Sequence, residues 1–344
     1  MGRIGFCEVL PLKKRIFFYF AALLILILDT KTAMAGAREA IQLCLQTVIP
    51  SLFPFMVLTS VLTGLLSRFS GYARSFLLGI LGGYPTGAQA VAQGVRDGHI
   101  SQEMGRKLLA FCSNAGPAFL FGMGANLFPN AWMCWAIWGI HILSALLASL
   151  FFPVRGEIQT SQTQSEVTLI QALSRSVWVM GLICGWIVLF RVVLSFFQRW
   201  FLWNLPGWLG CLLCGILELS NGCVGLMEIE SIQLRFVLFS VFLGFGGICV
   251  AMQTHAVTEG MDASLYLPGK ILQALFSAIL SASFFSREIA LIAIPTFLFL
   301  FVKKGIAFGP KLMYNRAKHH GRKLPCSFAK RSSPCAPTAS TPRS

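Results

Sequence analysis

The stretch that decides the fold is LKKRIFFYFAALLILIL, residues 12–28, in which a basic triplet precedes thirteen uninterrupted apolar residues. It is the first of about nine apolar blocks in a chain of 344 residues with mean hydropathy +0.71, 56% hydrophobic and 12% charged residues. Because a soluble core cannot bury so much apolar surface, we expect most of the chain to lie in lipid. Only helices or closed barrels satisfy the backbone there, and these blocks are too long and too apolar for barrel strands. The sequence therefore predicts an all-α polytopic membrane protein.

Both ends of the chain are basic, and this predicts the side of the membrane on which they lie. The net charge is +15, and from Lys303 onward there are ten Lys or Arg and no acid. The N-terminus carries Arg3 and Lys13-Lys14-Arg15 against a single Glu8. By the positive-inside rule both termini are expected to be cytoplasmic, which requires an even number of crossings, about eight. We expect the tail to contact anionic lipid rather than nucleic acid, because it adjoins the last apolar block.

The start of the chain also resembles a secretory signal, with Ala33-Met34-Ala35 before Gly36. Cleavage there would begin the mature chain near Gly36. We favour the alternative of an uncleaved first span, because many-span proteins commonly use their first helix as an insertion signal.

Polar stretches divide the chain into two membrane halves and a tail. Thr30 to Glu39 is expected to be a short polar connection, followed by a span, Ala40 to Leu66, that Pro50 and Pro54 break near its middle. The stretch Arg155 to Gln171 is rich in Gln, Ser and Thr and is the clearest linker. We therefore divide the chain into a first membrane half (1–153), a polar linker (154–175), a second membrane half (176–302) and a basic, disordered tail (303–344).

The two halves are weakly similar in sequence. Gly82-Gly83 followed by Gln89 matches Gly246-Gly247 followed by Gln253 at a constant offset of 164 residues. The same offset places the break expected at Pro54 opposite Glu218. Chance similarity in a Gly-rich apolar chain is the alternative. A true repeat would indicate a transporter that holds its substrate between paired broken helices near the midplane of the membrane.

Helix breakers and polar residues interrupt several apolar blocks. The segments GGYPTGAQ (82–89) and SNAGP (113–117) place them at membrane depth, where irregular backbone must be buried in protein or line a wet cavity. Helices that restart there expose unpaired N–H groups, which favour an anion. Close helix packing by small residues is the alternative explanation. We expect a binding site lined by Gly83, Tyr84, Pro85, Thr86, Gln89, Ser113, Asn114, Glu218, Asn221, Gly247 and Gln253.

Charged residues inside the apolar blocks point to the same region, because each is costly in lipid. Glu218 lies beside Ser220-Asn221-Gly222 and could bind a coupling proton or cation. Arg191 could neutralise the substrate, pair with Glu218 or extend to the interface, and we favour the last. His141 and His255 are single, and a packed histidine is commoner than a relay.

The chain carries no recognisable catalytic or metal motif. It lacks a Walker sequence, a metal cluster and a nucleophile–base pair, and Cys211-x-x-Cys214 has no second pair, which favours packing over chemistry. We therefore expect no enzyme activity, no metal and no cofactor.

The interrupted segments resemble a known family. The motifs are IPSLFPF (49–55), GYPTGAQ (83–89), SNAGPAFLFG (113–122), LELS (217–220) and GFGGICVAMQ (244–253), in consistent order over roughly residues 15–302. Together they are similar to the YlbJ family of sporulation integral membrane proteins, which belongs with the gate or nucleoside-recognition membrane domains. The resemblance implies transport of dipicolinic acid from the mother cell across the outer forespore membrane. The chain departs from the family at Gln89, where relatives often carry a basic residue, and in its short linker and basic tail.

Rival functions remain at this point. The same architecture could move nucleosides or another metabolite, or the chain could be a non-transporting scaffold that recruits sporulation membrane partners through its basic tail. A membrane-embedded enzyme is a third alternative.

Overall fold

The computed structural model describes residues 11–65, 71–98, 100–153, 168–201, 205–293, 295–300 and 302. The chain forms two compact units, Met1–Ile294 and Pro295–Ser344. In the second unit, the described residues are helical. All the elements below belong to the first unit, where the described secondary structure is entirely helical.

The first half of the chain contains eight α-helices and one π-helical turn in the described residues. In order they are α1 (Leu12–Leu28), α2 (Thr30–Leu43), the π turn η1 (Cys44–Val48), α3 (Ile49–Leu65), α4 (Gly71–Gly82), α5 (Thr86–Arg96), α6 (Gln102–Cys112), α7 (Pro117–Leu127) and α8 (Ala131–Ser149). The second half follows with α9 (Leu169–Trp200), α10 (Gly207–Leu217), α11 (Leu219–Gly225), the 3-10 turn η4 (Leu226–Glu228), α12 (Ile232–Phe245), α13 (Gly247–Val257) and α14 (Tyr266–Ala282).

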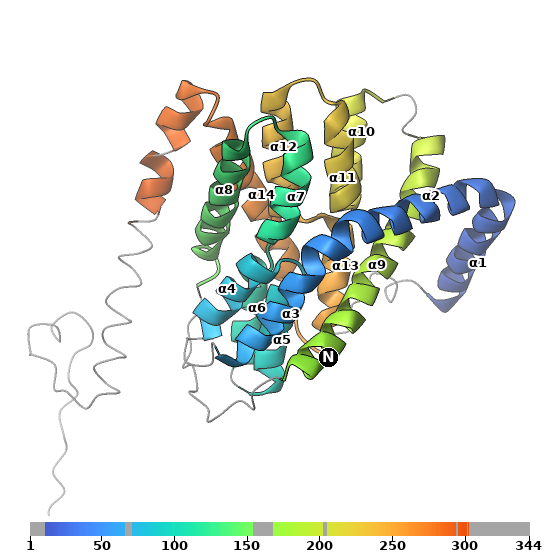
Figure 1. Cartoon of the computed structure of the whole chain (residues 1–344), viewed down its shortest axis with the longest axis horizontal. Helices are drawn as coiled ribbons and strands as arrows, with labels where there is room; N and C mark the ends of the chain where they lie inside the picture. The colour runs from blue at the N-terminus through green and yellow to red at the C-terminus, as the bar shows by residue number, and fades with distance from the viewer. Residues whose placement is uncertain are drawn as a thin grey trace, which may run out of the picture. The chain divides into compact units, whose positions relative to one another are not determined.

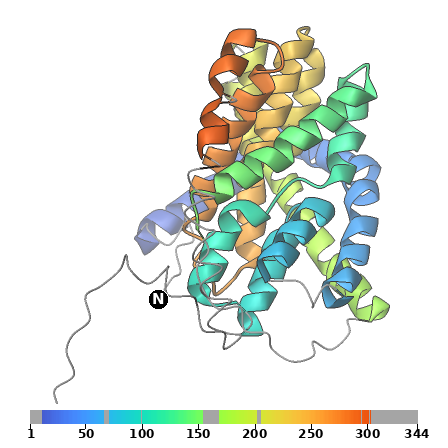
Figure 2. The same cartoon turned by 90° about the vertical axis from the view of Figure 1, so that its left-hand side faces the viewer.

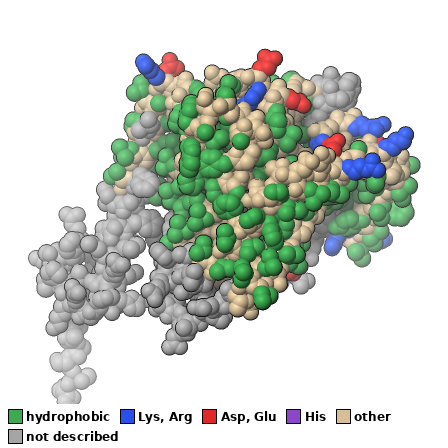
Figure 3. All heavy atoms as spheres, in the orientation of Figure 1, with side chains coloured by type: hydrophobic (Ala, Val, Ile, Leu, Met, Phe, Trp, Pro, Cys, Tyr) green, Lys and Arg blue, Asp and Glu red, His purple; other side chains and the backbone are tan. Residues whose placement is uncertain are grey.

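The prediction of an all-α polytopic membrane protein is confirmed. Within the described residues, five helical runs are long and apolar enough to cross a membrane: Thr30–Leu62, Gln102–Leu127, Ala131–Ser149, Leu169–Trp200 and Ile232–Val257. Large apolar side chains cover the outside of the helices, for example Phe17 at 76% exposed and Ile170 at 77%. Figure 3 shows hydrophobic side chains over much of the visible face. Such a surface is stable facing lipid rather than water.

The expected break at Pro50 and Pro54 is wrong. The helix runs from Thr30 to Leu62 without interruption, so the expected polar connection before Ala40 is helical as well. Pro50 has no N–H to donate to the helix. The π turn before it accommodates this loss, and there Ile49 N–H bonds to the carbonyl of Cys44. A wider turn of this kind removes the steric conflict that a proline otherwise creates.

The long helix α9 begins earlier than the predicted linker ends. Thr168 caps it in a capping box with Gln171, and the helix starts at Leu169. The last seven residues of the expected linker, 169–175, are therefore helical. The capping pattern Thr-x-x-Gln was present in the sequence and would have placed this boundary.

Two short hairpins reverse direction inside the bundle. In the first, α4 and α5 turn back on each other at residues 83–85, and a Cβ at Gly87 would lie 2.7 Å from Gly79 Cα. In the second, α10 and α11 turn back at Glu218, with Gly215 and Gly222 in contact. Helices of 12 and 11 residues extend only about 17–18 Å, so neither hairpin crosses the bilayer. The expected re-entrant segments are thus present.

Two longer helices are interrupted but continue forward. Residues 113–116 separate α6 from α7, and Gly246 separates α12 from α13. Gly246 adopts φ +83°, a left-handed conformation that glycine accepts without strain. In Figure 1, α6 lies below α7, whereas α12 lies above α13, so the two broken helices run in opposite directions.

The two halves are related as an inverted repeat. Each has a long helix, a re-entrant hairpin, an interrupted helix and a final helix, namely α2–α3, α4–α5, α6–α7 and α8 in the first, and α9, α10–α11, α12–α13 and α14 in the second. Figures 1 and 2 show the hairpin α4–α5 in the lower tier and the hairpin α10–α11 in the upper tier. The prediction of two similar halves is confirmed.

The sequence match nevertheless paired the wrong elements. The 164-residue offset sets Gly82-Gly83, at the tip of the first hairpin, against Gly246-Gly247, at the break between α12 and α13. In the structure, the element order sets the two hairpin tips against each other, with Tyr84 and Glu218 134 positions apart, and sets α8 against α14, where the contacting Ser144 and Ser277 are 133 positions apart. Gly-Gly pairs permit several kinds of helix interruption, so the motif alone does not identify which kind is present.

Candidate functional site

A small buried cavity lies where the interrupted segments meet. Its volume is about 30 Å³, which is room for one or two water molecules. Both hairpin tips and the break between α6 and α7 contribute to its wall. The lining residues are Val48, Leu52, Tyr84, Ala115, Gly116, Phe119, Ile183, Ile187, Glu218, Leu219, Ser220, Val250 and Gln253.

The tip of the first hairpin packs against the break in its own half. Gly83 has φ +76°, and a Cβ there would lie 2.9 Å from the backbone nitrogen of Gly116. Tyr84 then turns into the bundle, where its hydroxyl donates to the carbonyl of Leu243 on α12 at 2.9 Å. Pro85 and the buried Thr86 complete the tip, with Thr86 N bonded to Gly83 O. Tyr84 thus ties the first hairpin to the second half of the chain.

The tip of the second hairpin is organised by Glu218. Its carboxylate is 1% exposed and accepts from Ser220 N at 3.0 Å, Asn221 N at 2.7 Å and Asn221 Nδ2 at 2.5 Å. Glu218 is therefore the N-cap of α11. Asn221, an expected site residue, supports this carboxylate and is not among the residues that line the cavity.

The second break repeats the contact of the first. A Cβ at Gly247 would lie 3.2 Å from the backbone nitrogen of Leu219, just as Gly83 meets Gly116. Gly246 lies against the ring of Tyr84, 3.1 Å from the position of an added Cβ. One and two turns further along α13, Val250 and Gln253 face the cavity. Gln253 Nε2 donates to Cys249 Sγ at 3.4 Å, so its amide oxygen has room for another partner.

Ser113 and Asn114, both expected to bind substrate, face away from this cavity into a buried polar network. Asn114 Oδ1 accepts from Gln273 Nε2 at 2.9 Å, and Gln273 Oε1 accepts from Lys270 Nζ at 2.6 Å. Lys270 Nζ also donates to the carbonyl of Ser113 at 2.9 Å. Both α14 residues are fully buried. Our sequence reasoning missed Lys270 and Gln273, although a lysine seven residues before a serine-rich helix face (Ser277, Ser281) was a readable signal.

Gln89 lies apart from the other expected residues. It borders a second, wider pocket of about 420 Å³, together with Arg96, Trp178, Ala256, Val257, Glu259 and Gly260. Helices α9 and α13 contribute residues to both this pocket and the cavity, whereas α5 lines only the wider pocket.

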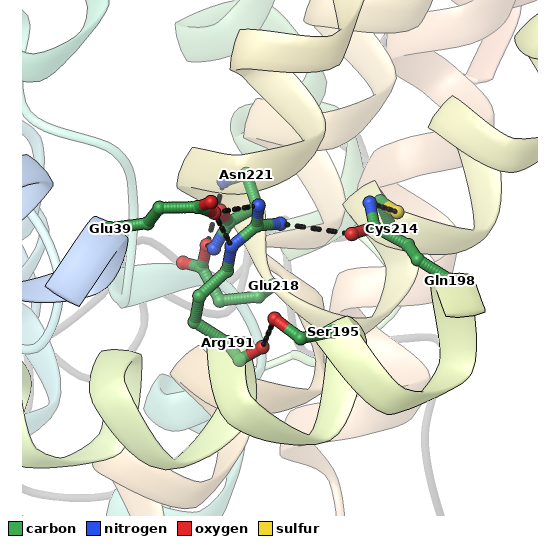
Figure 4. A network of polar contacts seen from close by, with 7 residues as sticks. All are labelled: Glu39, Arg191, Ser195, Gln198, Cys214, Glu218 and Asn221. Carbon is green, nitrogen blue, oxygen red and sulfur yellow. Dashed lines mark hydrogen bonds and ion pairs between the residues drawn. The ribbon is translucent and has the colours of Figure 1, made fainter. Parts of the chain in front are cut away.

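Arg191 pairs with neither a cavity residue nor Glu218. Its guanidinium donates to Glu39 through Nε at 2.9 Å and also contacts that carboxylate through Nη2. Nη1 reaches Gln198 at 3.4 Å (Figure 4). Glu39 comes from the segment that we had expected to be a polar connection. The pair joins α2 to α9 near Glu218 without touching it, so the hypothesis of an Arg191–Glu218 pair is wrong.

His141 and the two cysteines of the Cys211-x-x-Cys214 motif are buried between the helices of the bundle. His141 Nε2 accepts from the backbone N–H of Ala115 at 3.1 Å, which stabilises the break after α6. Cys211 and Cys214 are buried free thiols on α10. Among the described residues, no three or more His, Cys, Asp and Glu side chains cluster in a way that could hold a metal ion.

Two inverted halves, each with a re-entrant hairpin and an interrupted helix around a shared cavity, define the class: an all-α polytopic membrane protein with internal inverted symmetry. The chain is similar to the sporulation integral membrane protein YlbJ of Bacillus subtilis (strain 168), with 23% identity over 312 residues that cover 72% of this chain and 76% of that protein. The resemblance seen in the motifs is thereby confirmed as a distant relationship. No family model matches the chain. No solved structure matches it either.

Proposed function

We propose that this protein transports a small organic anion across the membrane, most specifically dipicolinic acid during endospore formation. The observation that carries the proposal is the convergence of Tyr84, Gly116 and Glu218, from both hairpin tips and the first helix break, on one buried cavity. Inverted repeats with broken helices near the midplane are the architecture in which transporters hold their substrates. The relative's description as a sporulation membrane protein supports the biological setting.

The cavity is too small for the substrate as it stands. A volume of about 30 Å³ holds one or two waters, whereas organic ligands occupy pockets of roughly 300 Å³ or more. Transport therefore requires the hairpin tips to separate. The glycine contacts at both tips suit such a movement, because small flat surfaces pack closely without interlocking side chains.

The wider pocket supplies an entrance in this proposal. It shares helices α9 and α13 with the cavity, and it carries both Arg96 and Glu259. Val257 and Gln253, one turn apart on α13, line the pocket and the cavity respectively. We therefore place Gln89 in the entrance rather than at the central site, which reconciles its position with a role in substrate passage.

Uptake by proteoliposomes of the purified chain tests the proposal. Dipicolinate, its mono-acid analogue picolinate and uridine would be offered separately. We expect saturable uptake of dipicolinate, reduced in Gln253→Ala and retained in the control Gln233→Ala, an exposed position on α12. Uptake of uridine instead would indicate a nucleoside transporter of the same architecture. Folded protein that takes up none of the three would contradict transport by this chain alone and favour a scaffold.

A further inference from the structure

A lysine without a countercharge lies beside the cavity. Lys270 is fully buried, and none of the four ion pairs among the described residues includes it. Its Nζ donates to the Ser113 carbonyl and to Gln273, and its third direction faces the ring of Tyr84, whose centroid is 5.0 Å away. A buried charge without a partner of opposite sign is costly, so its presence needs a physical reason.

Three buried hydroxyls lie together near this lysine. The hydroxyl of Tyr266 interacts with those of Thr254 and Ser113, and all three residues are buried. No further partner of the three hydroxyls is found in the described part of the chain. Buried polar groups normally satisfy all of their hydrogen bonds, so hydroxyls that interact only with one another are available to a polar ligand.

His141 adds one further donor near Lys270. Because its Nε2 accepts from Ala115, the neutral ring carries its proton on Nδ1. That nitrogen is buried and without a partner among the described residues. We name Lys270, His141, Ser113, Thr254 and Tyr266 the Lys270 cluster.

The inverted repeat shows that this lysine is present in one half only. Ser277 donates to Ser144 at 3.0 Å where α14 and α8 cross. Because α8 and α14 are the final helices of the two halves, we align the halves on these two serines. Seven residues before them stand Lys270 and Ile137, both fully buried. A requirement common to both halves would place similar residues at both positions. A single anion bound on one side of the pseudo-symmetry axis requires only one cation.

We infer that the Lys270 cluster is a subsite for one carboxylate of the transported anion. The inference rests on the proposed function, and it specifies which residues receive the negative charge. The cluster offers an ammonium and several neutral donors, a combination that matches a carboxylate through charge-assisted hydrogen bonds. None of the five residues lines the cavity, but Tyr84 contacts both Lys270 and the cavity, so displacement of its ring would open the cavity toward the cluster.

A purely structural role for Lys270 makes different predictions. Its bond to the Ser113 carbonyl caps the C-terminal end of α6, where a cation is favourable. Glutamine at position 270 can still donate to this carbonyl but carries no charge. Lys270→Gln therefore separates capping from carboxylate binding, and Lys270→Met, which mimics the apolar residue of the other half, provides a second uncharged variant.

Ligand-dependent thermal stabilisation of the purified full chain tests the inference. Dipicolinate should raise the melting temperature of the wild type, and Lys270→Gln should weaken the apparent affinity on the order of tenfold or more. Picolinate has one carboxylate. If that carboxylate binds elsewhere in the site, Lys270→Gln should weaken the affinity for picolinate less than the affinity for dipicolinate. Lys107→Gln is the matched control, because it removes a lysine from the outer face of α6 and should leave the affinity unchanged.

Unchanged affinity for dipicolinate in both Lys270→Gln and Lys270→Met would overturn the inference. So would a wild type that neither dipicolinate nor picolinate stabilises. Uptake measured in parallel separates it from the proposed function. Binding that depends on Lys270 without any uptake would contradict transport and leave the subsite standing. Dipicolinate uptake that is identical in the variants would contradict the subsite and leave transport standing.

Discussion

Replacement of Glu218 by alanine provides the sharpest test of how the second hairpin is held. The carboxylate makes three hydrogen bonds, to Ser220 N, Asn221 N and Asn221 Nδ2, and it is 1% exposed. Alanine removes all of them and leaves two backbone N–H groups at the start of α11 without their acceptor. Loss of an N-cap costs about 1–2 kcal/mol, and a buried unpaired donor costs about 1–3 kcal/mol.

Part of this cost is offset, because removal of a buried carboxylate also removes its desolvation penalty. We therefore expect Glu218→Ala to lower the free energy of unfolding by about 2 kcal/mol. For a large domain this corresponds to a fall in melting temperature on the order of 4–8 °C. Far-UV circular dichroism of the purified protein in detergent, at a single scan rate, measures it.

Two further variants define the contribution of each bond. Asn221→Ala removes only the side-chain bond and should cost about 0.6 kcal/mol, the typical value for a polar contact between membrane helices. Glu228→Ala removes an exposed carboxylate from the neighbouring turn η4 and should stay within about 0.5 kcal/mol of the wild type.

A melting temperature of Glu218→Ala within 1 °C of the wild type would refute the capping role. That result would favour the hypothesis that Glu218 binds a coupling proton or cation. This hypothesis makes a separate prediction. Glu218→Gln would abolish any pH dependence of uptake while leaving the melting temperature unchanged. If Glu218 is chiefly a cap, the same variant lowers the melting temperature by less than Glu218→Ala, because it retains one acceptor oxygen.

Three other predictions follow from single contacts. Gly246→Ala should destabilise the protein by at least ~1–2 kcal/mol, because φ is +83° and the added Cβ would meet Tyr84; Gly181→Ala on α9, where the space is open, should be neutral or stabilising in the same thermal assay. Tyr84→Phe should cost about 1 kcal/mol, because it removes a buried bond to a carbonyl on α12 but keeps the ring; equal melting temperatures would contradict this. Arg191→Ala should cost no more than about 1 kcal/mol and leave anion uptake intact, because Arg191 pairs with the half-exposed Glu39 outside the cavity; abolished uptake in folded protein would return Arg191 to the substrate site.

The sequence predicted the positions of the helix interruptions more reliably than the backbone structure at each interruption. The Gly-Gly and Ser-Asn-Ala-Gly-Pro segments were recognised as interruptions, and each does end a helix. Pro50 and Pro54 were read as a break, but the helix continues through both, and a π turn accommodates Pro50. A breaker residue changes local backbone energetics, but neighbouring turns decide whether the helix ends, kinks or continues.

Site residues were predictable only as far as local chemistry fixes them. Tyr84, Glu218 and Gln253 do line the cavity, and each lies within or close to a helix interruption in the sequence. Gln89 lies on α5, five residues after Tyr84 in the preceding turn, yet it borders another pocket. The serine face that follows Lys270 signals a buried polar helix, but it does not identify the partners Ser113 and Tyr84, which are distant in sequence.

The sequence by itself determined that most of this protein lies in lipid and that its secondary structure is helical. Apolar runs of this length must be helical in lipid, because the backbone has no other hydrogen-bond partner there, and this holds whatever the helices pack against. Only the tertiary structure decided that the interruptions are of two kinds, hairpin and through-going, and that inverted symmetry brings them together. The hydrophobic pattern does not distinguish between these arrangements, because a helix face in lipid is apolar whether it contacts protein or acyl chains. Close contacts between small residues select the packing instead.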